Sequence, residues 1–208
     1  MAAEAELSFV HLFEPGAGAV PPLLLLHGTG GDERDLAPLG RVIAPGAALL
    51  SPRGKVMENG MPRFFRRLRE GVFDEADVRF RAAELAAFVG EARAAYRLPK
   101  PVAVGFSNGA NIAAAVLLLS PPTLAGAVLL RPMTPLSAED GESLTGVRAL
   151  LVSGLSDPIA PLADAARLAD MLRRRGAEVR QEAIVGSHGL TQRDIALSAE
   201  FVASFREG

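Results

Sequence analysis

The sequence predicts an α/β fold in which helices cover both faces of a mostly parallel sheet. Short apolar runs bounded by glycine and proline alternate along the chain with stretches in which apolar residues recur at helical spacing. The runs are apolar at successive positions, as strands are when both faces of a parallel sheet are buried. Because 208 residues suffice for one folded unit, we expect a single domain over 1–208.

Each element can be placed along the chain. Five runs are expected to form the central strands: LLLLH from Leu23, AALLSP from Ala47, PVAVGFS from Pro101, AGAVLLRP from Ala125 and RALLVSG from Arg148. Two weaker segments, 7–13 and 178–184, are expected as edge strands. Helical spacing predicts helices over 33–43, 77–96, 108–119, 162–175 and 190–205.

The connection 54–75 is unusually long and contains no obvious strand. Loops of this length in compact domains are more often functional than decorative. Its apolar side chains could form the wall of a pocket or a lid. Equally, they could only anchor a surface loop to the core. They are Met57, Met61, Phe64, Phe65 and Phe73.

The composition disfavours several kinds of partner and location. The formal net charge is −2 and basic residues are interspersed with acidic ones, so we expect no binding of nucleic acid or of an anionic membrane. The absence of cysteine excludes disulfides, thiolate metal sites and a cysteine nucleophile. The N-terminal segment is acidic, and the apolar runs are too short to span a membrane. We therefore expect a soluble cytoplasmic protein.

The segment GFSNG, residues 105–109, matches the pattern G-x-S-x-G where an expected strand passes into an expected helix. A serine on such a sharp turn exposes its hydroxyl, and the flanking glycines leave room for the turn. The N-terminus of the following helix favours negative charge that develops nearby. Ser107 is therefore the candidate nucleophile; the alternative is a serine that only caps the helix.

A serine hydroxyl needs a general base within hydrogen-bond distance, and histidine is the usual one. In enzymes that use this serine turn, an acidic residue and then a histidine follow the serine along the chain. His188 is the only histidine after Ser107, and it lies in the glycine-flanked loop GSHGL. We predict that His188 is the base.

The imidazole in turn needs a carboxylate that fixes its tautomer and stabilises its protonated form. Asp157 follows an expected strand in the turn GLSDPIAP, at the carboxyl edge of the sheet, where such groups converge. Asp164 and Asp170 fall on an expected helix instead. We predict Asp157 for this role, although an Asp-Pro pair is also common in turns that have no such function.

The segment HGTGGDE, from His27 to Glu33, follows another expected strand and suits an oxyanion hole. By analogy with esterase loops, the donors would be the backbone N–H groups of Thr29 and of Asn108, the residue after the nucleophile. We expect His27 to shape this loop. The glycines do not form a nucleotide-binding pattern, and no two histidines have metal-ligand spacing, so we expect neither cofactor nor metal.

Together these segments resemble the phospholipase/carboxylesterase family of α/β-hydrolases, small serine esterases that include acyl-protein thioesterases. The resemblance runs from LLLLHGTGGDERDL through SPRG, GFSNGANIA, LLRPMTPL and SGLSDPIAP to GSHGL. It implies the α/β-hydrolase fold without a large cap domain, and a triad of Ser107, Asp157 and His188. It also implies a homodimer.

These observations predict a serine carboxylesterase that hydrolyses small to medium, mostly apolar esters through an acyl-enzyme. Alternatives on the same site are a thioesterase and a lysophospholipase, and a rival of another class is a non-catalytic small-molecule binding protein on the same fold. Arg53 and Arg131, at the ends of expected strands, would tie loops together or receive a substrate carboxylate. The residues expected to line the substrate pocket are Met61, Phe64, Phe65 and Met133.

Overall fold

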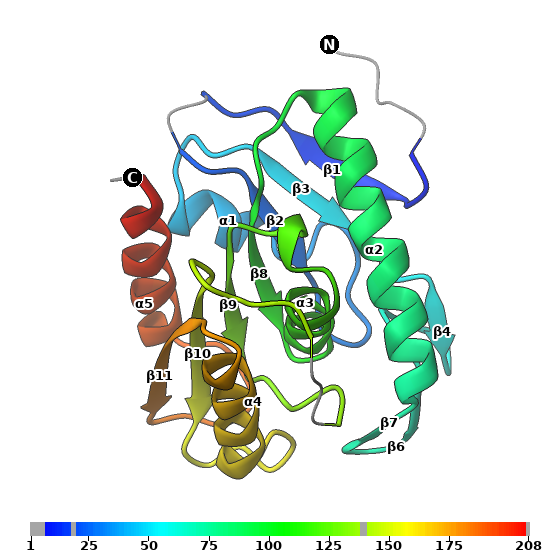
Figure 1. The fold of residues 1–208 in the computed structure, drawn as a ribbon, viewed down its shortest axis with the longest axis vertical. Helices are drawn as coiled ribbons and strands as arrows, with labels where there is room; N and C mark the ends of the chain where they lie inside the picture. Colours follow the sequence, from blue (N-terminus) through cyan, green and yellow to red (C-terminus); the bar gives the residue numbers. More distant parts are fainter. Residues whose placement is uncertain (1–6, 18–19, 138–140, 207–208) are drawn as a thin grey trace.

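The computed structural model describes residues 7–17, 20–137 and 141–206, and a seven-stranded sheet runs through it (Figure 1). In spatial order the strands are β1 (His11–Glu14), β3 (Leu49–Pro52), β2 (Leu23–Leu26), β8 (Val102–Phe106), β9 (Gly126–Leu130), β10 (Arg148–Gly154) and β11 (Glu178–Ile184). Neighbouring strands are parallel except β1, which pairs antiparallel with β3. The predicted mostly parallel sheet is confirmed.

Helices cover both faces of this sheet, as predicted (Figure 1). On one face lie α2 (Glu75–Tyr96), α3 (Asn108–Leu119) and α4 (Leu162–Arg174), and on the other lie α1 (Ala37–Ile43) and α5 (Gln192–Ala203). Two short 3-10 helices, Pro121–Thr123 and Ser204–Arg206, follow α3 and α5. Among the described helices, none is long and apolar enough to cross a membrane.

The central strands send alternate side chains into two separate cores. Leu24 and Leu26 of β2 pack on the side of α2, α3 and α4, whereas Leu23 and Leu25 pack on the side of α1 and α5. All four side chains are buried, and β8, β9 and β10 alternate in the same way. The two-residue period of a strand therefore explains why these runs are apolar at successive positions.

The helix α3 is buried along almost its whole length, from Asn108 to Leu118. A helix enclosed on all sides carries apolar residues all round, which explains its sequence NIAAAVLLL. Its first turn lies against the end of β2. A Cβ atom at Gly109 would lie 1.9 Å from the carbonyl oxygen of Leu26, so only glycine fits there.

Three helices begin at residues other than those predicted. The helix α1 begins at Ala37 instead of 33, because Pro38 is favoured in a first turn and the preceding residues form the loop after β2. The helix α2 begins at Glu75, two residues early, because the Asp74 carboxylate accepts a hydrogen bond from the backbone N–H of Asp77 and caps the helix. The helix α5 begins at Gln192 instead of 190, because Thr191 and Asp194 form a capping box at its N-terminus.

The expectation that segment 54–75 contains no strand is wrong. The segment forms two small hairpins, β4 (Val56–Glu58) with β5 (Met61–Arg63), and β6 (Arg67–Arg69) with β7 (Val72–Phe73). The first hairpin turns at Asn59 and Gly60, which have φ angles of 51° and 79°. An Asn-Gly pair favours this turn, so the signal was present in the sequence.

The contact between α3 and β2 predicts that Gly109→Ala is strongly destabilising. The added Cβ would overlap backbone atoms that cannot rotate away, and such overpacking costs about 1–3 kcal/mol or more. The matched control is Gly90→Ala in α2, where nothing lies within 4 Å of the new Cβ and the free energy of unfolding should rise by about 0.5–1 kcal/mol. Urea denaturation measures both changes, and equal effects would contradict the account.

Candidate active site

The candidate site lies where the strand order reverses. From β2 the chain continues to β3 on one side, whereas from β8 it continues to β9 on the other. The loops that leave the carboxyl ends of β2 and β8 therefore diverge, and such a switch point is the usual place for a site in an open parallel sheet. Ser107 follows β8, and the loop containing Thr29 follows β2.

Ser107 occupies a strained turn between β8 and α3. Its φ and ψ angles are 52° and −112°, and its N–H donates to the carbonyl of Leu130 on β9 at 2.8 Å. The turn brings α3 so close to β8 that a Cβ atom at Gly105 would lie 2.4 Å from the carbonyl oxygen of Gly109. The Ser107 hydroxyl makes no capping hydrogen bond to α3, so it is available to a base.

The structure brings the three predicted triad residues together from separate strand ends. His188 Nε2 lies 3.0 Å from Ser107 Oγ, and His188 Nδ1 lies 2.8 Å from Asp157 Oδ2. Because a carboxylate only accepts, Nδ1 carries the proton that faces Asp157, and Nε2 is left to accept the proton of Ser107. This is the arrangement that activates a serine hydroxyl.

The Asp157 carboxylate is buried and held by the backbone of its own turn. Burial alone would raise its pKa by disfavouring the charged form. The N–H groups of Ala160 and Ile159 donate to Oδ1 at 3.0 and 2.8 Å, and the His188 ring contacts Oδ2. These groups outweigh burial, so the pKa of Asp157 is lowered and the residue stays ionised.

The lowered pKa predicts a pH-dependent contribution of Asp157 to stability. Since the folded-state pKa lies below the unfolded value of about 4, the ionised carboxylate stabilises the fold above that value and this contribution is lost as the pH falls through the lower folded pKa. We expect the free energy of unfolding of the wild type to exceed that of Asp157→Asn most at neutral pH. Urea denaturation from neutral pH to below about 4 measures this difference; a difference that grows on acidification contradicts the expectation.

A buried arginine fixes the loop that carries His188. Arg131 donates from Nε to the carbonyl of Ser187 and from Nη2 to that of Gly189, both at 2.9 Å, and so holds the backbone on both sides of His188. Its guanidinium also pairs with Asp194 of α5 at 2.7 and 3.0 Å, and both side chains are almost fully buried. Of the two roles considered for Arg131, the structure therefore shows the tying of loops.

This ion pair predicts that Arg131→Met is strongly destabilising. The substitution leaves the Asp194 carboxylate buried without its partner, which typically costs about 3–5 kcal/mol. The matched control is Arg173→Met, which removes a pair with Asp170 in which both side chains are exposed, and should change stability little. Urea denaturation compares the two variants, and similar small effects would show that the Arg131 pair is dispensable.

The loop after β2 is shaped by His27, as expected. His27 Nε2 accepts a hydrogen bond from the N–H of Gly54 at 3.0 Å, so Nδ1 is the donor to the carbonyl of Gly28 at 2.7 Å. Burial lowers the pKa of His27 and keeps the ring neutral. Arg53 supports the same loop through two hydrogen bonds to Glu33, at 2.6 and 2.9 Å.

Thr29 and Asn108, which the sequence predicts to supply the oxyanion donors, line the same cavity as Ser107. Among the described residues, the backbone N–H groups of Thr29 and Asn108 have no hydrogen-bond acceptor. The first N–H groups of any helix lack a partner within the helix, and Asn108 opens α3. The two side chains are fixed, because Thr29 Oγ1 accepts from Arg63 at 2.7 Å and Asn108 Oδ1 accepts from the N–H of Phe64 at 2.7 Å.

A cavity of about 340 Å³ opens on the triad. Met133 lines it, whereas Phe64 and Phe65 are buried in the core and Met61 packs near Gly30. The lining is more polar than the sequence suggested. The residues that line the cavity are Thr29, Arg63, Arg67, Glu70, Gly71, Phe73, Phe106, Ser107, Asn108, Asn111, Met133, Ile159 and His188.

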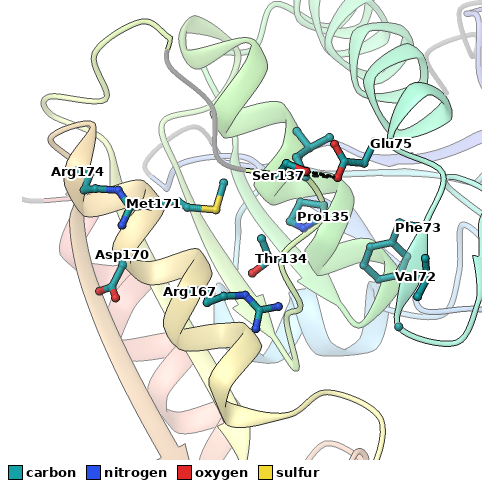
Figure 2. Close-up of a pocket in the computed structure, with 12 residues that line it drawn as sticks. Val72, Phe73, Glu75, Thr134, Pro135, Ser137, Arg167, Asp170, Met171 and Arg174 are labelled. Carbon is teal, nitrogen blue, oxygen red and sulfur yellow. Dashed lines mark hydrogen bonds between the residues drawn. The ribbon is translucent and has the colours of Figure 1, made fainter.

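A second, larger cavity of about 480 Å³ lies between β7 and α4 (Figure 2). It shares Gly71 and Phe73 with the cavity on the triad, so these residues belong to the wall between the two. Arg167 and Asp170 of α4 also line it, but none of the triad residues does. Ser107 and His188 therefore face the smaller cavity.

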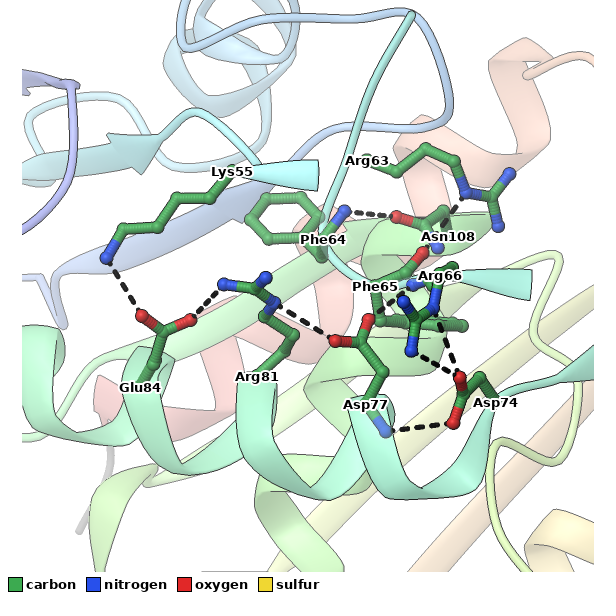
Figure 3. A network of polar contacts seen from close by, with 10 residues as sticks. All are labelled: Lys55, Arg63, Phe64, Phe65, Arg66, Asp74, Asp77, Arg81, Glu84 and Asn108. Atoms are coloured by element: carbon green, nitrogen blue, oxygen red, sulfur yellow. Dashed lines mark hydrogen bonds and ion pairs between the residues drawn. The ribbon is translucent and has the colours of Figure 1, made fainter. Parts of the chain in front are cut away.

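Ion pairs and hydrogen bonds fasten segment 54–75 to α2 (Figure 3). Lys55 pairs with Glu84 of α2 at 3.1 Å. Within the segment, Arg66 pairs at 2.7 Å with Asp74, the residue that caps α2. The backbone N–H of Arg66 also donates to the Asp77 carboxylate at 2.7 Å. The segment thus forms an anchored wall of the site, which combines the two roles considered for it.

The sheet, its covering helices and the serine turn define an α/β-hydrolase fold without a large cap domain. The chain is similar to the Bacillus cereus carboxylesterase, with 42% identity, a TM-score of 0.92 and coverage of 95% of this chain and 94% of that one. It is similar to a carboxylesterase from Mesorhizobium loti, with 32% identity, a TM-score of 0.90 and 96% coverage of each chain. It is 43% identical to MhqD of Bacillus subtilis (strain 168) over 92% of this chain and 96% of that protein.

The family profile described as Phospholipase/Carboxylesterase matches residues 12–205. The chain therefore belongs to the phospholipase/carboxylesterase family, as its sequence motifs predicted, and it is a carboxylesterase-family hydrolase that acts on esters.

Proposed function

We propose that this chain is a serine carboxylesterase in which Ser107 is the nucleophile, His188 the general base and Asp157 the residue that orients the base. The observation that carries the proposal is the continuous hydrogen-bonded chain from Ser107 Oγ through His188 to Asp157, with distances of 3.0 and 2.8 Å. Its position at the switch point of the sheet, beside a cavity, supports the same conclusion.

In the first step, Ser107 Oγ attacks the ester carbonyl carbon while His188 Nε2 takes the hydroxyl proton. The carbonyl oxygen becomes an oxyanion that accepts hydrogen bonds from the N–H groups of Thr29 and Asn108, and each such donor is worth about 3–4 kcal/mol in the transition state. His188 then gives its proton to the leaving alcohol, and the acyl group stays on Ser107.

In the second step, a water molecule attacks the acyl-enzyme and His188 Nε2 takes its proton. Collapse of the second tetrahedral intermediate returns that proton to Ser107 Oγ and releases the acid. The cavity of about 340 Å³ is at the small end of the range for small-molecule sites, which supports small to medium esters as substrates.

Hydrolysis of p-nitrophenyl esters of increasing acyl length tests this proposal. We expect Ser107→Ala to lower kcat by about 10⁴-fold or more, because no other group replaces the nucleophile. Ser120→Ala, at the far end of α3, is the matched control and should retain activity. Equal rates in Ser107→Ala and the wild type would remove Ser107 from the mechanism.

Two other hydrolase activities are compatible with the same site, and one alternative function belongs to a different class. A thioesterase would prefer thioesters and a lysophospholipase would prefer single-chain phospholipids over simple esters of equal acyl length. A non-catalytic binding protein would bind esters in the cavity without turnover. Assembly as a homodimer stays a prediction, and sedimentation velocity measures it.

A further inference from the structure

The cavity on the triad has a buried cation in its wall. Arg63 lies at the end of β5, lines the cavity together with Ser107 and Asn108, and has a side chain that is 3% exposed. An arginine this deeply buried is uncommon unless its charge is compensated. Its surroundings therefore show whether the fold or a ligand supplies that compensation.

The protein compensates the charge of Arg63 only in part; Figure 3 shows one of its contacts, the hydrogen bond to the carbonyl of Phe65. Nη1 donates to Thr29 Oγ1 at 2.7 Å, Nε donates to the carbonyl of Phe65 at 3.2 Å, and Nε lies 3.3 Å from Glu58 Oε2. Within the described residues, Nη2 has no hydrogen-bond acceptor. Burial lowers the pKa of Arg63 despite the nearby Glu58, which indicates that desolvation outweighs the compensation.

The carboxylate beside Arg63 is shared with a second arginine. Glu58 Oε1 accepts from Arg67 Nε at 2.8 Å and lies 2.7 Å from Arg67 Nη2, and Arg67 also lines the cavity. One carboxylate therefore faces two guanidinium groups. The acidic residue among those that line the cavity is Glu70. Its side chain is exposed, so water and salt screen its charge.

We propose that the cavity takes esters that carry a carboxylate a few atoms from the ester bond, such as monoesters of short dicarboxylic acids, and that Arg63 binds this carboxylate. The inference rests on the proposed esterase function. Arginine suits the role because its planar N–H donors match a carboxylate, and Nη2 retains free donors. The Asn108 Nδ2 atom, buried without a partner among the described residues, is a further donor at the same cavity.

The competing explanation is that Arg63 only positions the oxyanion loop through Thr29. Loss of Arg63 would then weaken the turnover of all esters by the same factor, because every substrate uses that loop. Loss of a carboxylate-binding residue would instead change the ratio of kcat/KM for charged esters to kcat/KM for neutral esters. This ratio therefore separates specificity from positioning.

Two pairs of isosteric esters measure this ratio near pH 7.5, where the free carboxyl groups are ionised. Monoethyl succinate and ethyl 4-methylpentanoate differ in a charge on the acyl side. The acetate ester of 3-hydroxypropanoate and 3-methylbutyl acetate differ in a charge on the alcohol side. A pH-stat follows acid release by the wild type, Arg63→Gln and Arg69→Gln, the last being a matched loss of charge in the second hairpin outside the cavity lining.

We expect the wild type to favour the charged member of at least one pair by about tenfold or more in kcat/KM, the worth of one hydrogen bond to a charged group. Arg63→Gln should lose this preference and Arg69→Gln should keep it. Equal ratios in all three proteins, or a wild-type preference for both neutral esters, would overturn the inference while leaving the esterase function intact.

Calorimetric titration of Ser107→Ala keeps the test independent of turnover and of the folding of Arg63→Gln. Succinate should bind at least about tenfold more tightly than 4-methylpentanoate. Equal affinities would overturn the carboxylate site. If the wild type hydrolyses no ester but this binding preference is present, the proposed function fails while the carboxylate-binding site of the cavity stands.

Discussion

The site depends on the close approach of α3 to the central strands at the turn that carries Ser107. Ser107 can occupy its strained conformation because Gly105 and Gly109 leave no side chain between the turn, the first residues of α3 and the end of β2. This contact sets the position of the Ser107 hydroxyl and that of the Asn108 N–H, which has no acceptor within α3. The buried apolar helix α3 holds the turn in place from within the core.

The position of His188 beside Ser107 is set by buried polar contacts and not by apolar packing. Its loop has no regular structure, and its position is set by the buried pair of Arg131 and Asp194 together with hydrogen bonds to carbonyl groups on either side of the histidine. At the end of β10, a Cβ atom at Gly154 would lie 2.4 Å from the carbonyl oxygen of Ser187, so glycine lets this loop pass close to the loop of Asp157. Buried charges thus determine a geometry that apolar packing alone does not specify.

The sequence was sufficient for the sheet, for most helices and for the triad candidates, because these follow from periodicity, from a motif at a strand-to-helix turn and from a single available histidine. The sequence did not predict which residues form the wall of the cavity. Phe64 and Phe65 looked like pocket residues because they are apolar, but they pack into the core beneath the hairpins. Arg63 faces the cavity through its contact with Thr29, 34 residues away along the chain, which no local pattern reveals.

Covalent labelling tests the proposal that Ser107 is the activated nucleophile. A phosphonofluoridate probe reacts with serine hydroxyls that a base has activated, and mass spectrometry locates the adduct. We expect a single adduct on Ser107 in the wild type and much slower labelling in His188→Ala, because Nε2 would no longer take the Ser107 proton. Labelling of another serine, or equal rates in both proteins, would rule out this role of Ser107.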